Sequence, residues 1–422
     1  MITRLHVRLT ACGSGLYGQR LKVIRMGLTA KIKERIHRLL WAGTSVFYRC
    51  LKYKHDENVV FLPFFGRLGD MVMFLDALEG WKELIINRHK KKFVLGCRKE
   101  VWALLQSAGA DQGLEYIELT REKLNQSYAY FTDRIRQTRA LRAGKLINVR
   151  DNSAIEHVFL YATAIPDSVV YRSFDIEASN RIQLFFSTHT YRTEMRPETE
   201  MDQLTCYADM LRRFGLSSFN SKIPELPPVG ERSRKINGDY VCVCPGASVE
   251  NKCWPVERYA KVLDHIAERT RFSIVFSGGK GDRNISEKII SKMEHRDMVV
   301  DLTGETSLSE WIATIREARF VVTNESGSVH IAAASKVQAI CIGEQKFSDK
   351  WLPYRPEVTR EDDRNPIIIR GPRLSCEFCV KRGFRRSSEC KKCYEEHGTV
   401  KCVYDVKLDD VIRAVDNLID AL

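Results

Sequence analysis

The segment Asn324–His330, with the sequence NESGSVH, combines residue types that can bind an anion beside a sugar. It follows an apolar run and precedes a run of alanines, as a strand followed by a helix would. The first turn of a helix offers unpaired N–H groups and the positive end of the helix dipole. Gly327 lets the backbone approach a ligand closely, and the Ser326 and Ser328 hydroxyls and the histidine ring can donate hydrogen bonds. Glu325 cannot help a phosphate, but it can accept hydrogen bonds from sugar hydroxyls. We therefore predict a diphosphate cradle with a sugar contact; the alternative is an ordinary helix start capped by Ser326.

A second group of candidate ligand-binding residues follows two other strand-like runs. Lys252 lies just after a Pro-Gly-Ala-Ser loop, and its ammonium group can neutralise a phosphate and the charge that grows on a departing nucleoside diphosphate. Ser248 can hydrogen-bond the same phosphates. Asp282, which follows a glycine pair, is a candidate for binding hydroxyls of the same ligand, although Glu287 competes for that role. The alternative for Lys252 is a solvated surface lysine.

Asp70 is the candidate general base. It lies in the stretch GRLGDMVMF, directly after the strand-like run NVVFLPFF. A carboxylate held by such a glycine turn can take the proton that an attacking sugar hydroxyl must lose. The alternative is a helix-capping aspartate that only stabilises backbone N–H groups.

Five cysteines near the C-terminus have the spacing of a metal site. Two CxxC pairs about ten residues apart are typical of a four-thiolate zinc or iron centre, and basic residues between them favour thiolates. Cys402 would be a spare or alternative ligand, and free or redox-labile thiols are the other interpretation. The four predicted ligands are Cys376, Cys379, Cys390 and Cys393.

Strand-like and helix-like runs alternate along most of the chain and predict a parallel sheet in each of two halves. The first half is expected to end with a strand at 181–188, RIQLFFST, and a Pro- and Ser-rich linker follows the next helix. In such folds ligands lie at the carboxyl ends of the strands. The predicted strand ends are 66–70, 245–252, 278–283 and 324–330.

Composition and charge narrow the class of protein. The 422 residues are 44% hydrophobic and 29% charged, which is typical of globular domains, and no apolar run is long enough for a transmembrane helix. No secretory signal is expected, and a reducing compartment fits the scattered cysteines.

Residues 1–54 hold twelve Lys or Arg and one acid, which is most of the net charge of +13. Residues 28–48 read as a basic amphipathic helix that binds an anionic membrane surface; a helix packed on the body and a nucleic-acid arm are the alternatives.

Several of these stretches resemble one family. PGAS, NKCWPVERYA, DLTGETSLSEWIATIREARFVVTNESGSVHIAAASKV and KWLPY are similar to glycosyltransferase family 9, the heptosyltransferases, over roughly 236–356, and GRLGDMVMFLDAL is similar to its N-terminal loop. The resemblance implies a GT-B fold, in which two Rossmann-like domains face a cleft, here with a basic N-terminal helical extension. Glu325 stands where the family has Asp, and Ser328 stands where it has Pro. These two differences bear on the identity of the donor sugar rather than on the fold.

The resemblance implies an inverting glycosyltransferase that needs no metal for transfer, in which Asp282 would bind the ribose hydroxyls of the donor. Its donor would be an ADP-sugar such as ADP-heptose, and its acceptor an anionic glycolipid such as a lipopolysaccharide core. Its place would be peripheral, on the inner face of the bacterial cytoplasmic membrane, with no nucleic-acid partner. A non-catalytic nucleotide-sugar-binding or scaffold protein of the same fold, and a zinc-containing nucleic-acid binder, are the alternatives. The expected segments are the N-terminal extension (1–54), the acceptor-side domain (55–200), a helix and linker (201–236), the donor-binding domain (237–370), a cysteine-rich segment (371–404) and a C-terminal helix (405–422).

Overall fold

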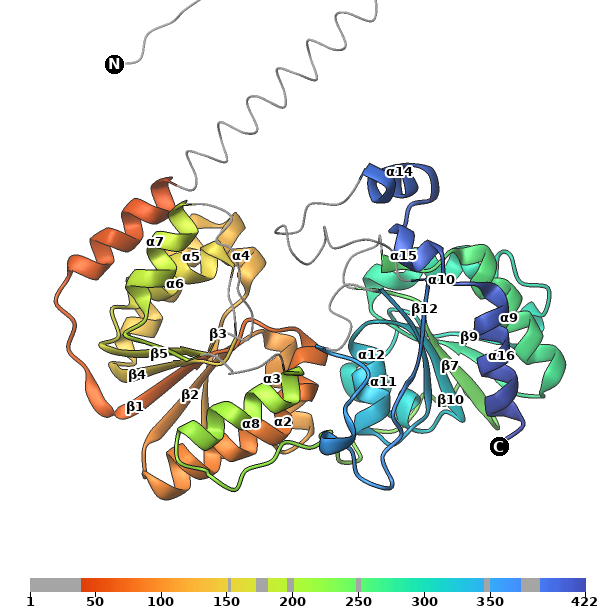
Figure 1. The fold of residues 1–422 in the computed structure, drawn as a ribbon, viewed down its shortest axis with the longest axis horizontal. Coiled ribbons are helices and arrows are strands. Elements are labelled where there is room, and N and C mark those ends of the chain that lie inside the picture. The colour runs from red at the N-terminus through yellow and green to blue at the C-terminus, as the bar shows by residue number, and fades with distance from the viewer. Residues whose placement is uncertain are drawn as a thin grey trace, which may run out of the picture.

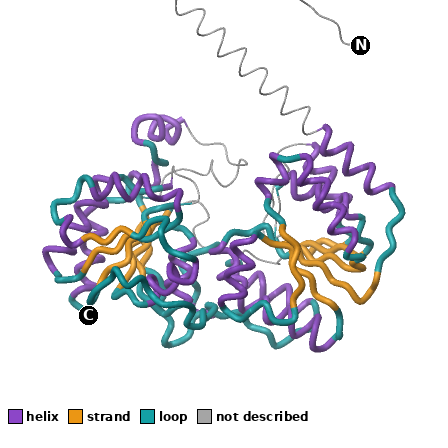
Figure 2. The backbone as a smooth tube through the Cα atoms, turned by 180° about the vertical axis from the view of Figure 1, so that it is seen from behind, coloured by secondary structure: helices purple, strands orange, loops and turns teal. Residues whose placement is uncertain are grey.

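Two six-stranded parallel sheets, each covered by helices on both faces, make up the body of the molecule (Figure 1). The computed structural model describes residues 39–150, 153–171, 181–195, 201–247, 252–344, 350–372 and 388–422. Figure 2 shows the two sheets lying side by side, each enclosed by its own helices. All strand pairs are parallel, as the alternation of strand-like and helix-like runs predicts.

The first sheet has the strand order β3-β2-β1-β4-β5-β6. Residues 39–50 form a helix ahead of it. The remaining elements of this half are β1 (Asp56–Pro63), α2 (Leu68–Lys82), the π-helical turn η1 (Glu83–Arg88), β2 (Lys92–Cys97), α3 (Lys99–Ser107), β3 (Leu114–Glu118), α4 (Arg121–Gln126), α5 (Tyr128–Ala140), β4 (Ala143–Asn148), α6 (Ala154–Thr163), β5 (Asp167–Tyr171), α7 (Arg181–Thr190), β6 (Thr193–Met195) and α8 (Gln203–Arg213).

The second sheet has the order β12-β11-β10-β7-β8-β9. Its elements are β7 (Tyr240–Cys244), α9 (Val256–Arg269), β8 (Ser273–Phe276), η3 (Lys280–Asp282), α10 (Arg283–Ile290), η4 (Arg296–Met298), β9 (Val299–Asp301), α11 (Leu308–Arg316), β10 (Phe320–Asn324), α12 (Gly327–Ala334), β11 (Ala339–Gly343), η5 (Pro356–Val358) and β12 (Ile367–Arg370). The chain closes with α14 (Ser388–His397), α15 (Lys401–Tyr404) and α16 (Leu408–Ile419).

One hydrophobic core joins the two halves. It runs from β1, α2 and α8 into α12 and the strands of the second sheet. A second core lies under α9 and α16, and a third under α5, α6 and the helix at 39–50. Because α2 and α12 pack against each other, the carboxyl edges of the two sheets meet at the starts of these two helices.

Local sequence sets the ends of several helices. Ser307 and Glu310 form the predicted capping box at the start of α11: Glu310 N donates to Ser307 Oγ (3.2 Å), and Ser307 N donates to Glu310 Oε2 (2.8 Å). Gly215, at φ +106°, follows the end of α8 in a conformation that glycine adopts without strain. Residues 216–236 form a linker without helix or strand.

The predicted strand at 181–188 is wrong, because these residues lie in helix α7. Phe186 and Thr190 are buried and four residues apart, while the exposed Phe185 and His189 stack on each other at 4.3 Å between ring centroids. This spacing is that of a helix with one buried face. The last strand of the sheet is instead the short β6, at its edge.

No helix in the described ranges is long and apolar enough to cross a membrane. The C-terminal helix α16 packs on α9 through Val411 and Val415, as its sequence predicts. Asp416 adds a contact to this packing, because its Oδ1 lies 2.8 Å from His265 Nε2 and 2.6 Å from Arg269 Nη1.

Candidate active site

The predicted ligand loop is a strand–helix junction, and its hydroxyls form a chain. Ser328 Oγ lies 2.7 Å from both Thr323 Oγ1 and Ser326 Oγ. Ser326 occupies the residue before α12, yet its side chain makes no capping hydrogen bond with the helix. The first-turn N–H groups of α12 are therefore not used by that hydroxyl, which argues against the simple capping interpretation of Ser326.

Asn324 connects this junction to the loop that carries Lys252. Its side chain is fully buried; Nδ2 donates to the Pro245 carbonyl, and Oδ1 accepts from Trp254 N at 3.2 Å. The ends of β7 and β10 are thus held together by one amide. Asn324 has a structural role that positions the loop, because both ends of its amide are used within the protein.

Glu325 lies behind the start of α12 with an unsatisfied carboxylate oxygen. Its Oε2 is shielded from solvent and has no hydrogen-bond partner. Burial, and to a smaller extent the nearby Glu344 carboxylate, raise the pKa of Glu325 to about 7 against the opposing charges of Lys252 and Arg370. A Cβ on Gly343 would lie 3.1 Å from Oε2, so the carboxylate packs closely against the backbone at the end of β11.

Lys252 forms an ion pair that the sequence did not suggest. Its Nζ lies 2.6 Å from Oε1 of Glu344, and the two side chains are 27% and 6% exposed. Arg370 at the end of β12 donates from Nε to the Glu344 carbonyl (3.2 Å) and from Nη2 to the Leu352 carbonyl (2.9 Å). Two acids and two bases therefore meet where the ends of β10, β11 and β12 adjoin the loop after β7. Glu344 directly follows a predicted strand, so the rule on strand ends places it at this edge, but that rule does not identify Lys252 as its partner.

Asp282 lies against the backbone of two strand ends. Its Oδ2 accepts from Gly279 N at 2.9 Å, and a Cβ on Gly246 would overlap its Oδ1 at 2.1 Å. Burial raises its pKa. This places Asp282 beside the Lys252 loop, and its ribose contact stays a prediction. Glu287 is exposed on α10, and Ser248 lies outside the described residues.

Asp70 starts α2 on the facing half, and it caps the helix as well as carrying a charge. Its Oδ2 accepts from Arg67 N at 2.7 Å, and its Oδ1 lies 3.2 Å from Nη1 of Arg150. Burial by itself would raise the pKa of Asp70, but the Arg150 guanidinium and the Arg67 N–H outweigh it and hold the pKa below its ordinary value. The capping contact that was the alternative for Asp70 is present, together with a charge partner that sequence reasoning missed.

The two halves touch through glycines beside Asp70. A Cβ on Gly69 would lie 2.7 Å from Cα of Gly327 and 3.2 Å from Cδ2 of His330. His330 is buried, and its Nδ1 lies 2.6 Å from the Tyr354 hydroxyl. Burial lowers the pKa of His330 to about 4, although Asp70 opposes the shift. The imidazole is therefore neutral at pH 7, and it packs at the contact between the starts of α2 and α12.

Arginines follow four neighbouring strands of the first sheet. Glu122 joins three of them: its Oε1 lies 3.5 Å from Nη2 of Arg67 and 3.6 Å from Nη2 of Arg121, and it also pairs with Arg98. Arg150 follows β4 and pairs with the aspartate of α2. Because the carboxyl ends of parallel strands share one edge, these arginines form a basic rim beside the proposed base. We call this set of four arginines the arginine rim.

The predicted cysteine site is described only in part. Cys390 and Cys393 are buried, and burial raises the pKa of the Cys393 thiol. Cys376 and Cys379 lie outside the described residues. Within the described ranges, no group of three or more His, Cys, Asp or Glu side chains could hold a metal ion.

Part of the chain is similar in sequence to known sugar transferases. Residues 169–361 match the model of glycosyltransferase family 9 (heptosyltransferase). A lipooligosaccharide heptosyltransferase 2 from Haemophilus ducreyi is 37% identical over 186 residues, which is 43% of this chain and 48% of that protein. Lipopolysaccharide heptosyltransferase 2 from Escherichia coli is 31% identical over 130 residues, which is 30% of this chain and 35% of that protein. The chain thus spans half or less of the length of these curated relatives.

Solved structures agree on the fold. A glycosyltransferase of family 9 from Veillonella parvula superimposes with a TM-score of 0.60 at 16% identity, covering 88% of this chain and all of that one. An E. coli heptosyltransferase with ADP-2-deoxy-2-fluoro heptose gives 0.56 at 14% identity, covering 85% and 99%. The fold is that of the two-domain α/β glycosyltransferases. In sequence, residues 169–361 are similar to the heptosyltransferases of glycosyltransferase family 9.

Proposed function

We propose that the protein transfers heptose from an ADP-activated donor to an anionic glycolipid such as a lipopolysaccharide core, with inversion and without a metal. The observation that carries this proposal is the meeting of two helix starts. Asp70, beside Gly69, faces the start of α12, where Gly327 follows Ser326 and Glu325. A base from one half and a ligand loop from the other thus lie on either side of one contact.

The donor is assigned to the second half. The first-turn N–H groups of α12 and the ammonium of Lys252 suit a diphosphate, and Ser248 is proposed to add a hydroxyl. Asp282, beside the same loop, is proposed to accept hydrogen bonds from the ribose. Glu325 is proposed to bind hydroxyls of the sugar, which is supported by its unpartnered Oε2.

The acceptor is assigned to the first half, and the arginine rim supports an anionic acceptor. Arginine binds carboxylate and phosphate groups in a bidentate geometry. The arginine rim lies at the strand ends next to Asp70. An acceptor hydroxyl near Asp70 would therefore belong to a sugar that carries negative groups.

The transfer step uses one base and one cation. Asp70 accepts the proton of the acceptor hydroxyl while that oxygen attacks the anomeric carbon of the donor. The bond from that carbon to the diphosphate oxygen breaks, and its electron pair leaves with ADP. Lys252 and the start of α12 stabilise the charge that grows on the leaving phosphate. A direct displacement from the opposite side inverts the anomeric configuration.

Two further assignments belong to this proposal. The protein works as a peripheral protein on the inner face of the bacterial cytoplasmic membrane, where a lipid-linked acceptor would be presented, and it has no nucleic-acid partner. Cys376, Cys379, Cys390 and Cys393 hold a structural zinc or iron, which is supported by the burial of the last two. Metal analysis of the purified protein, with a double serine variant of the last two cysteines as control, tests that site.

A donor screen joined to a transfer assay tests the reaction. ADP-heptose should raise the thermal midpoint, because a ligand that binds only the folded state stabilises it. Lys252→Ala should raise the donor KM and lower kcat, whereas Lys261→Ala, exposed on α9, should change neither. Unchanged donor kinetics in Lys252→Ala would remove this lysine from the site. Binding of ADP-sugars without turnover on any acceptor would instead favour a non-catalytic nucleotide-sugar-binding protein.

A further inference from the structure

The helix at 39–50 is apolar on two opposite sides. On the inner side, Trp41 and Ser45 are buried, and Trp41 Nε1 donates to the Leu124 carbonyl at 2.8 Å. The Trp41 ring packs against Tyr128 and Phe131, with centroids 5.3 and 5.9 Å apart. This side fixes the helix to α5, so the helix is an integral part of the first half.

The outer side of the same helix is exposed and equally apolar. Leu39 is 66% exposed and Phe47 is 61% exposed, and Leu40, Val46 and Leu51 are also exposed. At helical spacing Leu39, Leu40, Val46 and Phe47 are turned roughly 100–160° away from Trp41 around the helix axis, and Leu51 directly follows the last residue of the helix. A helix that is apolar all round is normally buried, so the outer side needs a partner that covers it.

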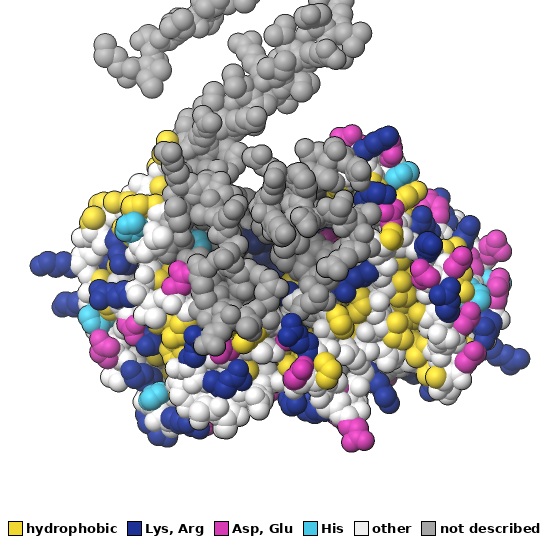
Figure 3. Space-filling model, in the orientation of Figure 1, with side chains coloured by type: hydrophobic (Ala, Val, Ile, Leu, Met, Phe, Trp, Pro, Cys, Tyr) yellow, Lys and Arg dark blue, Asp and Glu magenta, His cyan; other side chains and the backbone are white. Residues whose placement is uncertain are grey.

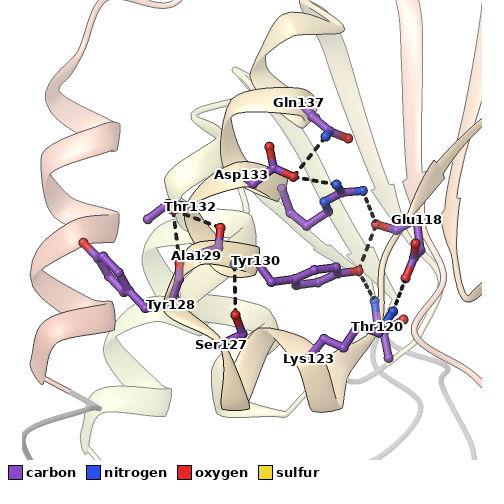
Figure 4. A network of polar contacts seen from close by, with 11 residues as sticks. Glu118, Thr120, Lys123, Ser127, Tyr128, Ala129, Tyr130, Thr132, Asp133 and Gln137 are labelled. Carbon is purple, nitrogen blue, oxygen red and sulfur yellow. Dashed lines mark hydrogen bonds and ion pairs between the residues drawn. The ribbon is translucent and has the colours of Figure 1, made fainter.

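The exposed apolar surface extends onto neighbouring helices. Tyr128 on α5 points toward this helix, as Figure 4 shows, and its hydroxyl lies 2.8 Å from Thr44 Oγ1. Arg49 stacks on Tyr161 at 5.1 Å, and Tyr161 contacts the exposed Phe185 of α7 at 6.1 Å. We call the exposed set the docking face: Leu39, Leu40, Val46, Phe47, Leu51, Tyr128 and Phe185.

The docking face gathers most of the exposed large apolar side chains. Among the described residues, only Tyr394 and Leu422 are exposed large hydrophobics outside it. Figure 3 shows hydrophobic side chains at the upper left edge, where Figure 1 places the first helix. A groove of ≈ 550 Å³ runs between this helix and α5, lined by Leu40, Phe47, Tyr128 and others.

Helix α5, which lies under the docking face, is held in place by hydrogen bonds. Figure 4 shows the polar network that ties α5 to the end of β3. The Tyr130 hydroxyl donates to the Glu118 carbonyl at 3.2 Å and accepts from Thr120 N at 3.1 Å. The apolar side chains of the helix and α5 are therefore presented on a fixed surface.

The charged Lys, Arg, Asp and Glu residues of the segment that carries most of the docking face are all basic. Residues 39–54 contain Arg49, Lys52 and Lys54 and no acid, and residues 1–38 carry nine more Lys or Arg and one Glu. Arg136 lines the groove. An apolar face with a basic border matches an anionic bilayer, in which acyl chains take the apolar side chains and headgroups take the cations. A second copy of the chain would bring its own basic border against this one, which disfavours a symmetric dimer.

We propose that the docking face binds the surface of an anionic bilayer, with the helix at 39–50 lying in the headgroup region. This rests on the proposed function, since a lipid-linked acceptor lies at such a surface. Shallow insertion of Leu39, Leu40, Val46 and Phe47 would hold the first half, which carries the arginine rim, at the membrane.

Vesicle flotation of the full-length protein tests the proposal. The wild type should float with vesicles containing phosphatidylglycerol, and less at high salt or with phosphatidylcholine alone. The double variant Leu40→Ser/Phe47→Ser should bind about 100-fold more weakly, since each buried apolar side chain is worth about tenfold or more. Leu422→Ser, which removes an exposed leucine outside the face, should bind as the wild type does. Lys52→Glu/Lys54→Glu should weaken binding only to the anionic vesicles.

Three results would overturn the proposal. One is unchanged flotation of the double serine variant. Another is equal binding of the wild type to neutral and anionic vesicles. The third is a wild-type dimer in light scattering that is lost in the double serine variant, because a second copy would then cover the face.

Equal thermal midpoints of variant and wild type confirm that the variant is folded. Turnover on a water-soluble acceptor separates this question from the reaction: the serine variant should keep wild-type kcat there, whereas failure of the wild type on every acceptor would count against the proposed function alone.

Discussion

Replacing Glu325 by Gln should stabilise the protein at alkaline pH and do much less at acid pH. Burial raises the pKa of Glu325 to about 7 in the folded protein, from an ordinary value of 4.5. The unfolded chain therefore releases this proton at lower pH than the folded chain does. Folded stability from this group is fully present below pH 4.5 and is lost as the pH rises through 7. Glutamine cannot ionise, so the variant should not suffer that loss.

The size of the effect follows from the separation of the two pKa values. At 1.36 kcal/mol per unit, a shift of roughly 2.5 units costs the wild type about 3 kcal/mol at pH 8. At pH 5 the same group costs only about 1 kcal/mol. This pH is only slightly above the pKa of 4.5 in the unfolded chain, and the folded carboxyl is still protonated. For a domain of this size the variant should melt roughly 6–12 °C higher than the wild type at pH 8 and roughly 2–4 °C higher at pH 5.

Thermal unfolding of both proteins at the two pH values is the measurement. Glu344→Gln is the matched control, because it removes a carboxylate from the same cluster but breaks the 2.6 Å ion pair with Lys252. It should lower the thermal midpoint at pH 8, the opposite sign to Glu325→Gln. A Glu325→Gln offset that is the same at both pH values, or a lower midpoint at pH 8, would refute a buried carboxyl that ionises near pH 7.

Three other predictions address the contact between the halves. Asp70→Asn should lower kcat by about 10²–10⁴-fold if Asp70 is the base, and it should cost about 3 kcal/mol of stability by leaving Arg150 without its charge partner; a variant that loses stability but keeps wild-type kcat would show a purely structural aspartate. Gly69→Ala must push α2 away from Gly327, because its Cβ would lie 2.7 Å from the Cα of that residue; kcat should fall about 100-fold and the radius of gyration in solution scattering should rise, whereas no change in either would contradict a tight glycine contact. His330→Gln should make the protein less sensitive to acid: burial lowers the pKa of His330 to about 4, so its stabilising contribution is present above its ordinary pKa of 6.5 and lost as the pH falls toward 4. Thermal midpoints between pH 7 and pH 5 check this, and parallel slopes for variant and wild type would contradict it.

The fold and one side of the site could be predicted from the sequence because parallel strands impose a simple rule. Strands β1, β7 and β10 read as buried apolar runs, and the residues directly after each strand must lie at the carboxyl edge of its sheet. That rule placed Lys252 and the segment 324–330 at the edge of one sheet and Asp70 at the edge of the other, without any knowledge of packing. Whether they act as predicted is a question for the kinetic variants.

The charge partners could not be predicted because they depend on strand order. Arg150 and Glu344 are single charged residues after strands, and nothing local distinguishes them from surface charges. Arg150 faces Asp70 because β4 pairs with β1, and Glu344 faces Lys252 because β11 and β7 flank β10. Strand order is set by tertiary packing and crossover connections, which a single sequence does not display.

The N-terminal helix shows a different limit. The sequence predicts a basic amphipathic helix over 28–48, of which residues 28–38 lie outside the described residues; from residue 39 on, the structure divides the apolar residues between two sides. Trp41 is inward because its ring packs beside Leu124 and Phe131, while Phe47 points outward. Periodicity alone assigns all apolar residues to one buried side, so the second surface became visible only with the fold.

The contact between the two halves leaves each ion pair of the candidate site within its own half. The helix starts approach through backbone at Gly69 and Gly327, so no side chain of these two residues bridges the halves at that point. Asp70 keeps its partner Arg150 within the first half, and Lys252 keeps Glu344 within the second. A diphosphate that reaches Lys252 therefore competes with a carboxylate already in place, and binding becomes an exchange of ion pairs rather than the creation of one. Exchange costs less desolvation than bringing a free ammonium and a free phosphate together, since the lysine has already lost much of its water. Under the proposed function, the same exchange would limit how tightly ADP is held after transfer, because Glu344 would return to the lysine as the product leaves.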